Sequence, residues 1–294
     1  VFIDANLPAA DTAYTGVDNR PRWAAIPGVP ACVTALGQEN GPCVTKINNL
    51  PGKNITAAYV IKNQSENRSW NVSGAVTKPM SSNGLMFKGG FNYGVSRSLV
   101  EPSSTAGSSW GSANPIVFDP NNPPLAISSN SPGKRFFLAA TYSHQYFGWG
   151  STTISAFYDA HPNIANPVIN TANASYVFSG DANGDTVSNN DLIYIPRDTS
   201  EMNFVTFTAN GRTYTAAEQA AAFEQYIQND PYLRDHRGQY AERDGLFYPM
   251  VNRIDLSLTQ DVFAGKHHGG QVRLDITNFG NLLNHNWGRQ INTG

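Results

Sequence analysis

The sequence predicts an all-β fold of antiparallel strands, and three observations support this prediction. Apolar and polar residues alternate along several segments, as they do on strands that have one face in an apolar environment. Clusters of Gly, Pro, Asn and Ser separate these segments, and only one stretch has a helical pattern. The clearest alternation runs from Asn252 to Phe279, where two segments flank a short glycine-rich turn. Its apolar positions are Ile254, Leu256, Leu258 and Val262, followed by Val272, Leu274 and Ile276.

The polar positions of the same stretch carry charges on both segments. A soluble sheet places its apolar face on a core, whereas a transmembrane β-barrel places that face on lipid and the charges in the lumen. In a barrel the charged residues would form the inner wall, with cross-strand ion pairs between them, or line the path of a solute. The residues expected to face the lumen are Arg253, Asp255, Asp261, Arg273 and Asp275.

The composition narrows the choice of environment. A net charge of −2 in 294 residues argues against a protein that binds nucleic acid by neutralising phosphates. Charged residues make up 14% of the chain and aromatic residues 11%, which suits an outer-membrane barrel or a secreted β-sandwich. No apolar run approaches the ~18 residues that a membrane-spanning helix needs.

Six segments long enough to cross a membrane are predicted as strands, and the connections between them alternate between short and long. The long connections are residues 1–53, 97–133 and 161–248. Outer-membrane barrels have this arrangement, with short periplasmic turns at one end and long extracellular loops at the other. The predicted strands are residues 69–78, 84–96, 135–146, 151–160, 249–263 and 270–282.

Six strands are too few to close a barrel, because the smallest bacterial barrels have about eight. An open edge cannot face lipid, where its backbone groups find no hydrogen-bonding partner. The chain is therefore expected to be part of a larger barrel, with strands missing at both ends. Since it begins at Val1 without a Met, we expect its numbering to begin inside a longer precursor.

One helix is predicted, within the longest connection. Thr215 and Glu218 have the spacing of a capping box, which satisfies two backbone N–H groups at a helix start. The run 216–228 is rich in Ala, Glu and Gln, and Pro231 follows it. This helix is expected to be the only one in the chain.

Several long motifs, in a consistent order, resemble the TonB-dependent outer-membrane receptors of the Oar-like type. The longest is SYVFSGDANGDTVSNNDLIYIPRDTSEMNF, from Ser175 to Phe204. The others are DNRPRW (18–23), HRGQYAERDG (236–245), VNRIDLSLTQDVF (251–263) and LDITNFGNLLNHNWG (274–288).

The resemblance implies a C-proximal part of a barrel of about 22 strands, with the plug domain, the TonB-contacting segment and the final strands outside this chain. It implies a bacterial outer-membrane transporter that is not an enzyme. Its extracellular loops would capture a large or scarce solute, and the TonB energy complex would drive uptake through the plug. Outer-membrane lipid is the expected environment, and the resemblance does not name the solute.

The motif Asp181-x-Asn183-x-Asp185 is a candidate calcium site. Oxygen-bearing side chains at alternate positions of a tight loop can converge on one hard cation, as in an EF-hand loop. The sequence departs from the EF-hand pattern, because Thr186 replaces the usual Gly and the next acid, Asp191, comes one position early. Asn190 could supply a further oxygen. The alternative is a turn whose Asp and Asn side chains accept hydrogen bonds from their own backbone.

Two further signals are weaker. Cys32 and Cys43 are the only cysteines and suggest a small loop disulfide, hence an oxidising compartment; two free thiols are the alternative. The string Gly107-Ser108-Ser109-Trp110-Gly111 matches G-x-S-x-G of serine hydrolases, but no predicted strand precedes it and no predicted helix follows it.

The competing hypothesis is a secreted β-sandwich that binds glycans or a partner surface. The two hypotheses differ in what the apolar strand faces contact. In a sandwich, Leu256 and Leu274 would pack in a dry interior against a second sheet, whereas in a barrel they would point outward to lipid.

Overall fold

The computed structural model describes residues 1–5, 7, 10, 12–13, 17–23, 58–148, 150–162, 173–185, 187–264 and 268–289. The chain divides into two compact units, which are considered one at a time. The sheet unit comprises Ser69–Ser96, Ser129–Asn173 and Phe247–Gly294. The loop unit comprises Val1–Arg68, Arg97–Ser128 and Ala174–Leu246. The fold is mostly antiparallel β with one large sheet, which confirms the all-β prediction.

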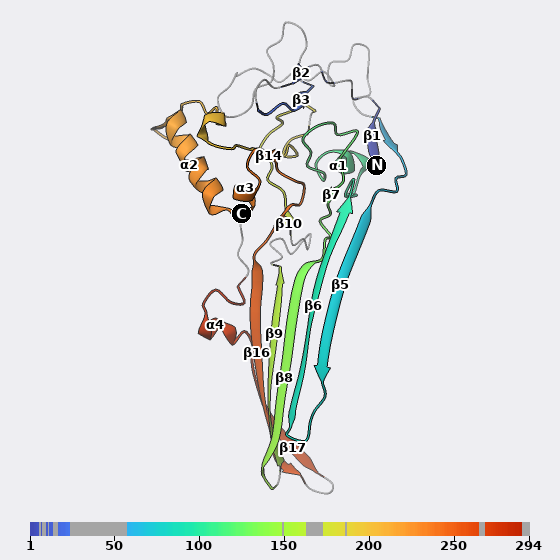
Figure 1. Ribbon diagram of the computed structural model, residues 1–294, viewed down its shortest axis with the longest axis vertical. Coiled ribbons are helices and arrows are strands. Elements are labelled where there is room, and N and C mark those ends of the chain that lie inside the picture. Colours follow the sequence, from blue (N-terminus) through green and yellow to red (C-terminus); the bar gives the residue numbers. More distant parts are fainter. Residues whose placement is uncertain are drawn as a thin grey trace. The chain divides into compact units, whose positions relative to one another are not determined.

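Six long strands form the large sheet in the order β17-β16-β9-β8-β6-β5, and the five longest run side by side as tall ribbons in Figure 1. A short strand, β7 (Ala126–Ile127), pairs with the end of β6. These six strands follow one another in the sheet in the same order as in the chain. β9 and β16 are also adjacent, although a long loop connection separates them in the sequence. The bounds are β5 (Arg68–Lys78), β6 (Leu85–Ser98), β8 (Gly133–Phe147), β9 (Gly150–Pro162), β16 (Met250–Ala264) and β17 (Gly269–Ile276).

The turn between β5 and β6 requires a glycine. Gly84 has φ +77°, in the left-handed region that L side chains rarely adopt. A Cβ atom at this position would lie 1.8 Å from the carbonyl oxygen of Ser143 on β8. The close approach permits a backbone hydrogen bond from Ser143 N to Gly84 O, at 2.8 Å. The lower end of β6 is thereby fixed against β8.

The last predicted strand is shorter than expected, because β17 ends at Ile276 and not at residue 282. Asn278 has φ +55°, which ends the extended conformation, and its N–H donates to Asp255 Oδ1 at 2.7 Å. The chain then turns into α4 (Gly280–Leu283). Gly288 N donates to Asn252 O, so this segment lies along the part of β16 that β17 does not reach.

The predicted helix is present as α2 (Ala216–Asn229), with its capping box formed in both directions. The expectation of a single helix is wrong, because α4, the short helices α1 (Ala106–Trp110) and α3 (Pro231–Asp235) and the 3-10 turn η1 (Thr199–Glu201) also form. Each is about one turn long, so none has the periodic pattern by which a sequence reveals a helix. Among the described residues, no helix is long and apolar enough to cross a membrane.

The loop unit has its own hydrophobic core, beneath helices α2 and α3. Ile195, Ile227 and Leu233 are completely buried at its centre, with Val117 and Leu192 packed beside them. Short strand pairs also form in the described residues, outside the large sheet. They are β1 (Phe2–Asp4) with β4 (Tyr59–Ile61), β2 (Thr12–Ala13) with β3 (Pro21–Arg22), β10 (Asn173–Ala174) with β15 (Leu246–Phe247), β11 (Tyr194–Ile195) with β14 (Gln239–Tyr240), and β12 (Phe207–Ala209) with β13 (Arg212–Tyr214).

Candidate functional site

The strand register places apolar side chains in rows across one face of the large sheet, here called the apolar face. Leu258 on β16 lies opposite Leu274 on β17 and opposite Ile154 on β9. Ile154 in turn lies opposite Tyr142 on β8, which lies opposite Leu85 on β6. Directly opposed residues share a face of a sheet, so one apolar row crosses five strands.

The large side chains of the apolar face are widely exposed. Val272 is 60% and Leu274 55% exposed, so no second layer of the described chain covers them. Leu256 is half-buried. A sandwich would bury both leucines in a dry interior, and the described residues do not pack on Leu274 in this way. The exposed members of the face are Trp70, Val72, Val76, Leu85, Phe87, Phe91, Tyr93, Phe136, Leu138, Tyr142, Ile154, Leu258, Val272, Leu274 and Ile276.

The opposite face is polar and contains the charged residues singled out in the sequence. Asp275 lies opposite Ser257, and Arg273 opposite Thr259. The expectation of cross-strand ion pairs is not met by either arginine: Arg253 pairs with Asp255 at 2.9 Å and Arg273 with Asp275 at 2.8 Å, each within one strand. Residues two apart on a strand share a face, so these pairs are local.

Cross-strand contacts on this polar face are made mainly by carboxylate, hydroxyl and amide groups. Asp261 accepts hydrogen bonds from Ser151 N and Oγ on β9 and from Gln271 Nε2 on β17. Thr141 and Ser155 join β8 to β9 at 3.0 Å. A hollow of about 420 Å³ lies on this face, and Ser257, Arg273 and Asp275 are among the residues that line it.

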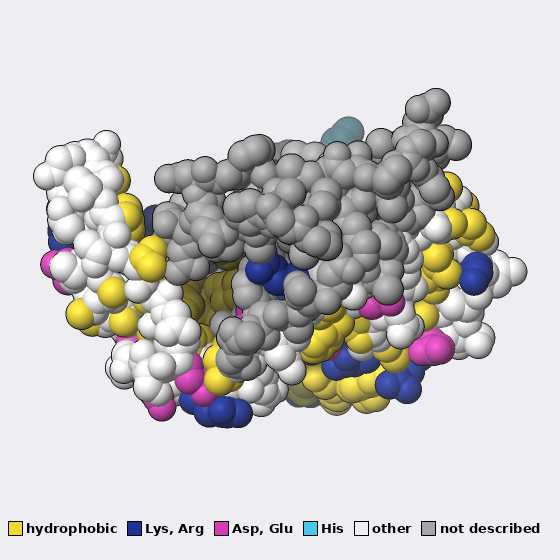
Figure 2. All heavy atoms as spheres, turned by 90° about the horizontal axis from the view of Figure 1, so that it is seen from above, with side chains coloured by type: hydrophobic (Ala, Val, Ile, Leu, Met, Phe, Trp, Pro, Cys, Tyr) yellow, Lys and Arg dark blue, Asp and Glu magenta, His cyan; other side chains and the backbone are white. Residues whose placement is uncertain are grey.

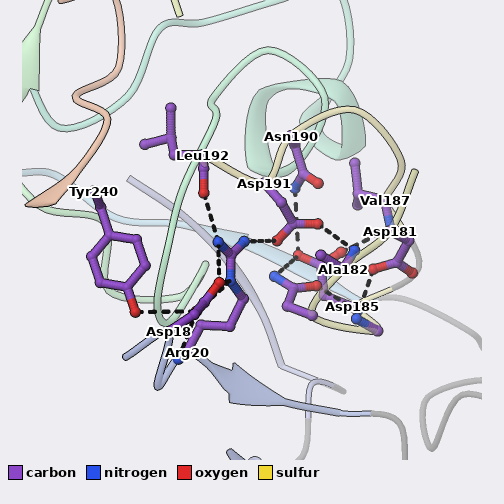
Figure 3. Close-up of polar contacts among 12 residues, drawn as sticks. Asp18, Arg20, Asp181, Ala182, Asp185, Val187, Asn190, Asp191, Leu192 and Tyr240 are labelled. Carbon is purple, nitrogen blue, oxygen red and sulfur yellow. Dashed lines mark hydrogen bonds and ion pairs between the residues drawn. The ribbon is translucent and has the colours of Figure 1, made fainter. Parts of the chain in front are cut away.

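In the loop unit, the predicted calcium motif forms a buried polar cluster between Gly180 and Leu192 (Figure 3). Asn183, Asp185, Asn190 and Asp191 are completely buried. Asp181 Oδ1 accepts from Gly184 N at 2.7 Å, Asn183 Oδ1 from Asp185 N at 2.9 Å and Asp185 Oδ1 from Val187 N at 2.8 Å. These are the backbone-capping turns of the alternative hypothesis, and a cation-binding loop would use them as well to hold its shape.

Burial makes the charged state of this cluster unfavourable. Burial, together with the nearby charge of Asp181, raises the pKa of the Asp185 carboxyl to about 7. Burial also raises the pKa of Asp191 to about 6, although the Ala182 N–H and the charge of Arg20 act in the opposite direction. Within the described residues, no group of three or more His, Cys, Asp or Glu side chains is arranged to hold a metal ion. Any cation site here must therefore draw on amide oxygens as well as carboxylates.

Arg20 belongs to this cluster, although the sequence gives no sign of it. Its Nη1 lies 3.5 Å from Asp191 Oδ1 and its Nη2 donates to the Leu192 carbonyl at 2.8 Å (Figure 3). Asp18 holds the other side of the guanidinium, and Tyr240 Oη donates to Asp18 Oδ1 at 3.1 Å. Three of the motifs that carry the family resemblance thus meet at one point, although they lie up to about 220 residues apart.

The two weaker sequence signals, the cysteine pair and the G-x-S-x-G string, have different outcomes. Cys32 and Cys43 lie outside the described residues. Ser109 is buried inside α1, where its Oγ donates to Thr105 O at 2.7 Å and accepts from Ser103 N at 2.8 Å. It does not stand at a strand-to-helix turn as a hydrolase nucleophile would.

Comparisons of the chain with protein-family models, curated proteins and solved structures found no match. Figure 2 shows one face of the molecule. In the described part of that face, Lys and Arg lie interspersed with Asp, Glu and hydrophobic side chains.

Proposed function

We propose that the large sheet is a wall segment of an outer-membrane β-barrel. The observation that carries the proposal is the exposed apolar face, which covers strands of 8 to 15 residues while the opposite face is polar. Water penalises such a surface by about 25 cal/mol for each Å² exposed, whereas hydrocarbon does not. A strand of ~9–11 residues, tilted by about 45°, crosses a bilayer.

The free edges of the sheet support a larger barrel. Among the described residues, β5 and β17 each have one neighbour in the large sheet, so each leaves a row of backbone groups for another strand. In lipid these groups must be paired, and barrel closure by strands outside this chain would pair them. The resemblance to Oar-like receptors, which implies a barrel of about 22 strands, is consistent with this proposal.

The proposed activity is capture of a solute by extracellular loops, followed by uptake driven by the TonB energy complex through a plug outside this chain. The loop unit has the build expected for such a surface, because its own core and helices order long connections that would otherwise be mobile. The polar, hollowed face of the sheet would then line the lumen.

Neighbouring residues on opposite faces provide the test. Leu258→Cys and Thr259→Cys are introduced separately into protein that carries Cys32→Ser and Cys43→Ser and is produced in its own cells. In isolated outer membranes, Leu258→Cys is expected to react with a maleimide dissolved in lipid and to resist a water-soluble one. Thr259→Cys is expected to show the reverse preference.

Equal reaction of both cysteines with the water-soluble maleimide would overturn the proposal. So would recovery of the protein in the soluble fraction without detergent, which is the outcome that a secreted sandwich predicts.

A further inference from the structure

The strongest unexplained group in the loop unit is the side chain of Asn190. It is completely buried, and its Oδ1 atom has no hydrogen-bond partner among the residues that the structure describes. Its Nδ2 points at Asp185 Oδ2 from 3.4 Å, so the amide is aimed into the acidic cluster. A buried amide oxygen without a partner destabilises the folded chain, which makes a ligand at this position worth seeking.

The distances around Asp185 fit oxygen ligands of a cation. Half a turn of the Asn190 amide exchanges two atoms of equal size; it gives up the hydrogen bond from Nδ2 to Asp185 and leaves Oδ1 facing that carboxylate. It would bring Oδ1 to the position that lies 3.4 Å from Asp185 Oδ2. Two oxygens bound at right angles to calcium, each about 2.3–2.6 Å from it, lie about 3.3–3.7 Å apart.

The charges of the cluster also favour a divalent cation. Four carboxyl groups, of Asp18, Asp181, Asp185 and Asp191, surround the one guanidinium of Arg20, and a bound cation would stabilise their ionised forms. Buried charges are tolerated when they are paired or coordinate a metal. The nearby donors are carboxylate and amide oxygens with no His or Cys among them, which selects a hard cation over zinc or copper. Calcium accepts irregular oxygen geometry, whereas magnesium requires a nearly ideal octahedron.

We propose that Asp181, Asp185 and Asn190 bind a calcium ion, with Asn183 adjacent. Asp191 is a positioning residue, because its carboxylate is held by Arg20 and by the N–H of Ala182 at 2.7 Å. The bound ion would fix the loop unit around this cluster, where three distant segments of the chain meet. The site does not depend on the barrel proposal, since all of its residues belong to the loop unit.

Terbium luminescence in the detergent-solubilised full protein provides a direct test. Trp23 is buried and its backbone N–H donates to Asn183 O at 2.8 Å, so its indole is close enough to the loop to sensitise a bound Tb³⁺. Tb³⁺ added to the protein is expected to luminesce on excitation of tryptophan, and calcium is expected to displace it more effectively than magnesium. The calcium dissociation constant is expected at or below the roughly 10⁻³ M typical of extracellular modules.

Two substitutions separate binding from nonspecific attraction. Asp185→Asn keeps the shape of the side chain and is expected to weaken calcium binding at least about tenfold. Asp235→Asn, at an exposed aspartate of the same unit, is expected to leave binding unchanged. If Asp185→Asn fails to fold, the wild-type protein decides alone, because a specific ion raises its melting temperature at millimolar calcium but not at equal magnesium. Equal melting temperatures in calcium, magnesium and chelator, or equal binding by Asp185→Asn, would overturn the proposal.

Discussion

The two units of the chain treat the same residue types in opposite ways. The loop unit buries Ile195, Ile227 and Leu233 completely, whereas the sheet unit leaves Val272 and Leu274 more than half exposed. Charges are reversed as well: Arg20 and Asp191 are buried in the loop unit, and the Arg253–Asp255 pair of the sheet unit is solvated. Hydrophobicity alone therefore does not decide which side chains a fold buries.

This difference in burial indicates the surroundings in which each unit is expected to be stable. The loop unit buries a hydrophobic core of its own, which stabilises it in water by ordinary packing. The sheet unit has an apolar face that the described residues do not cover, and lipid is the partner that our barrel proposal gives it. The comparison therefore predicts that matched substitutions will have different costs in the two units.

The largest difference is expected for the two kinds of ion pair. Arg20→Ala removes a buried guanidinium that contacts Asp18, Asp191 and the Leu192 carbonyl, and should cost about 3–5 kcal/mol of unfolding free energy. Arg253→Ala breaks a solvated pair and should cost less than about 1 kcal/mol. Urea unfolding in detergent micelles measures both. Equal costs would mean that the two units do not differ in how they hold charge.

The next largest effect should come from adding charge to the sheet. Leu138 is on the apolar face and Ala139 on the polar one, next to each other on β8. In lipid vesicles Leu138→Arg should destabilise the protein by about 2–4 kcal/mol, the cost of a charge near the bilayer centre. Ala139→Arg should cost much less, because its side chain enters the polar hollow. If Leu138→Arg were as stable in vesicles as the wild type, the apolar face would not be in contact with lipid.

The sequence predicts the sheet well and the buried cluster poorly, for a physical reason. The alternation of apolar and polar residues is a local pattern, so the sequence alone predicts that Leu256, Leu258 and Leu274 lie on one face of the sheet. The end of β17 is harder to predict from the sequence, because Asn278, in the left-handed conformation, contacts Asp255, 23 residues earlier. The ion pair of Arg20 with Asp191 spans 171 residues, and no local pattern encodes it.

A comparable effect is expected from pH in the loop unit. Burial raises the pKa of Asp244 from 3.8 to about 6, against the opposing charge of Arg243. The folded chain then holds a proton that the unfolded chain has lost, so stability falls as pH rises from about 4 to about 6 and changes little above that. The fall attributable to this residue is on the order of 3 kcal/mol.

The variant Asp244→Asn should remove that fall, because it has no proton to lose. Asn also suits the φ of +55° at this position. Urea unfolding between pH 4 and pH 7 provides the measurement, with the exposed Asp235→Asn as the control. An unchanged pH slope in Asp244→Asn would show that this carboxyl titrates normally in the folded protein.

The smallest effect sharpens the comparison most, because it should not depend on lipid at all. Thr215 Oγ1 accepts from Glu218 N at 3.2 Å, and the Glu218 carboxylate accepts from Thr215 N at 2.9 Å, at the start of α2. Thr215→Ala removes one half of this box and should cost about 1 kcal/mol. Amide hydrogen exchange should be faster in α2 and unchanged in β16, by the same amount in micelles and in vesicles. Glu218→Gln, which keeps an acceptor, should stay close to the wild type. If the cost of Thr215→Ala changed with the lipid as that of Leu138→Arg should, the two units would share one environment, and the contrast between them would have to be explained by packing within the chain.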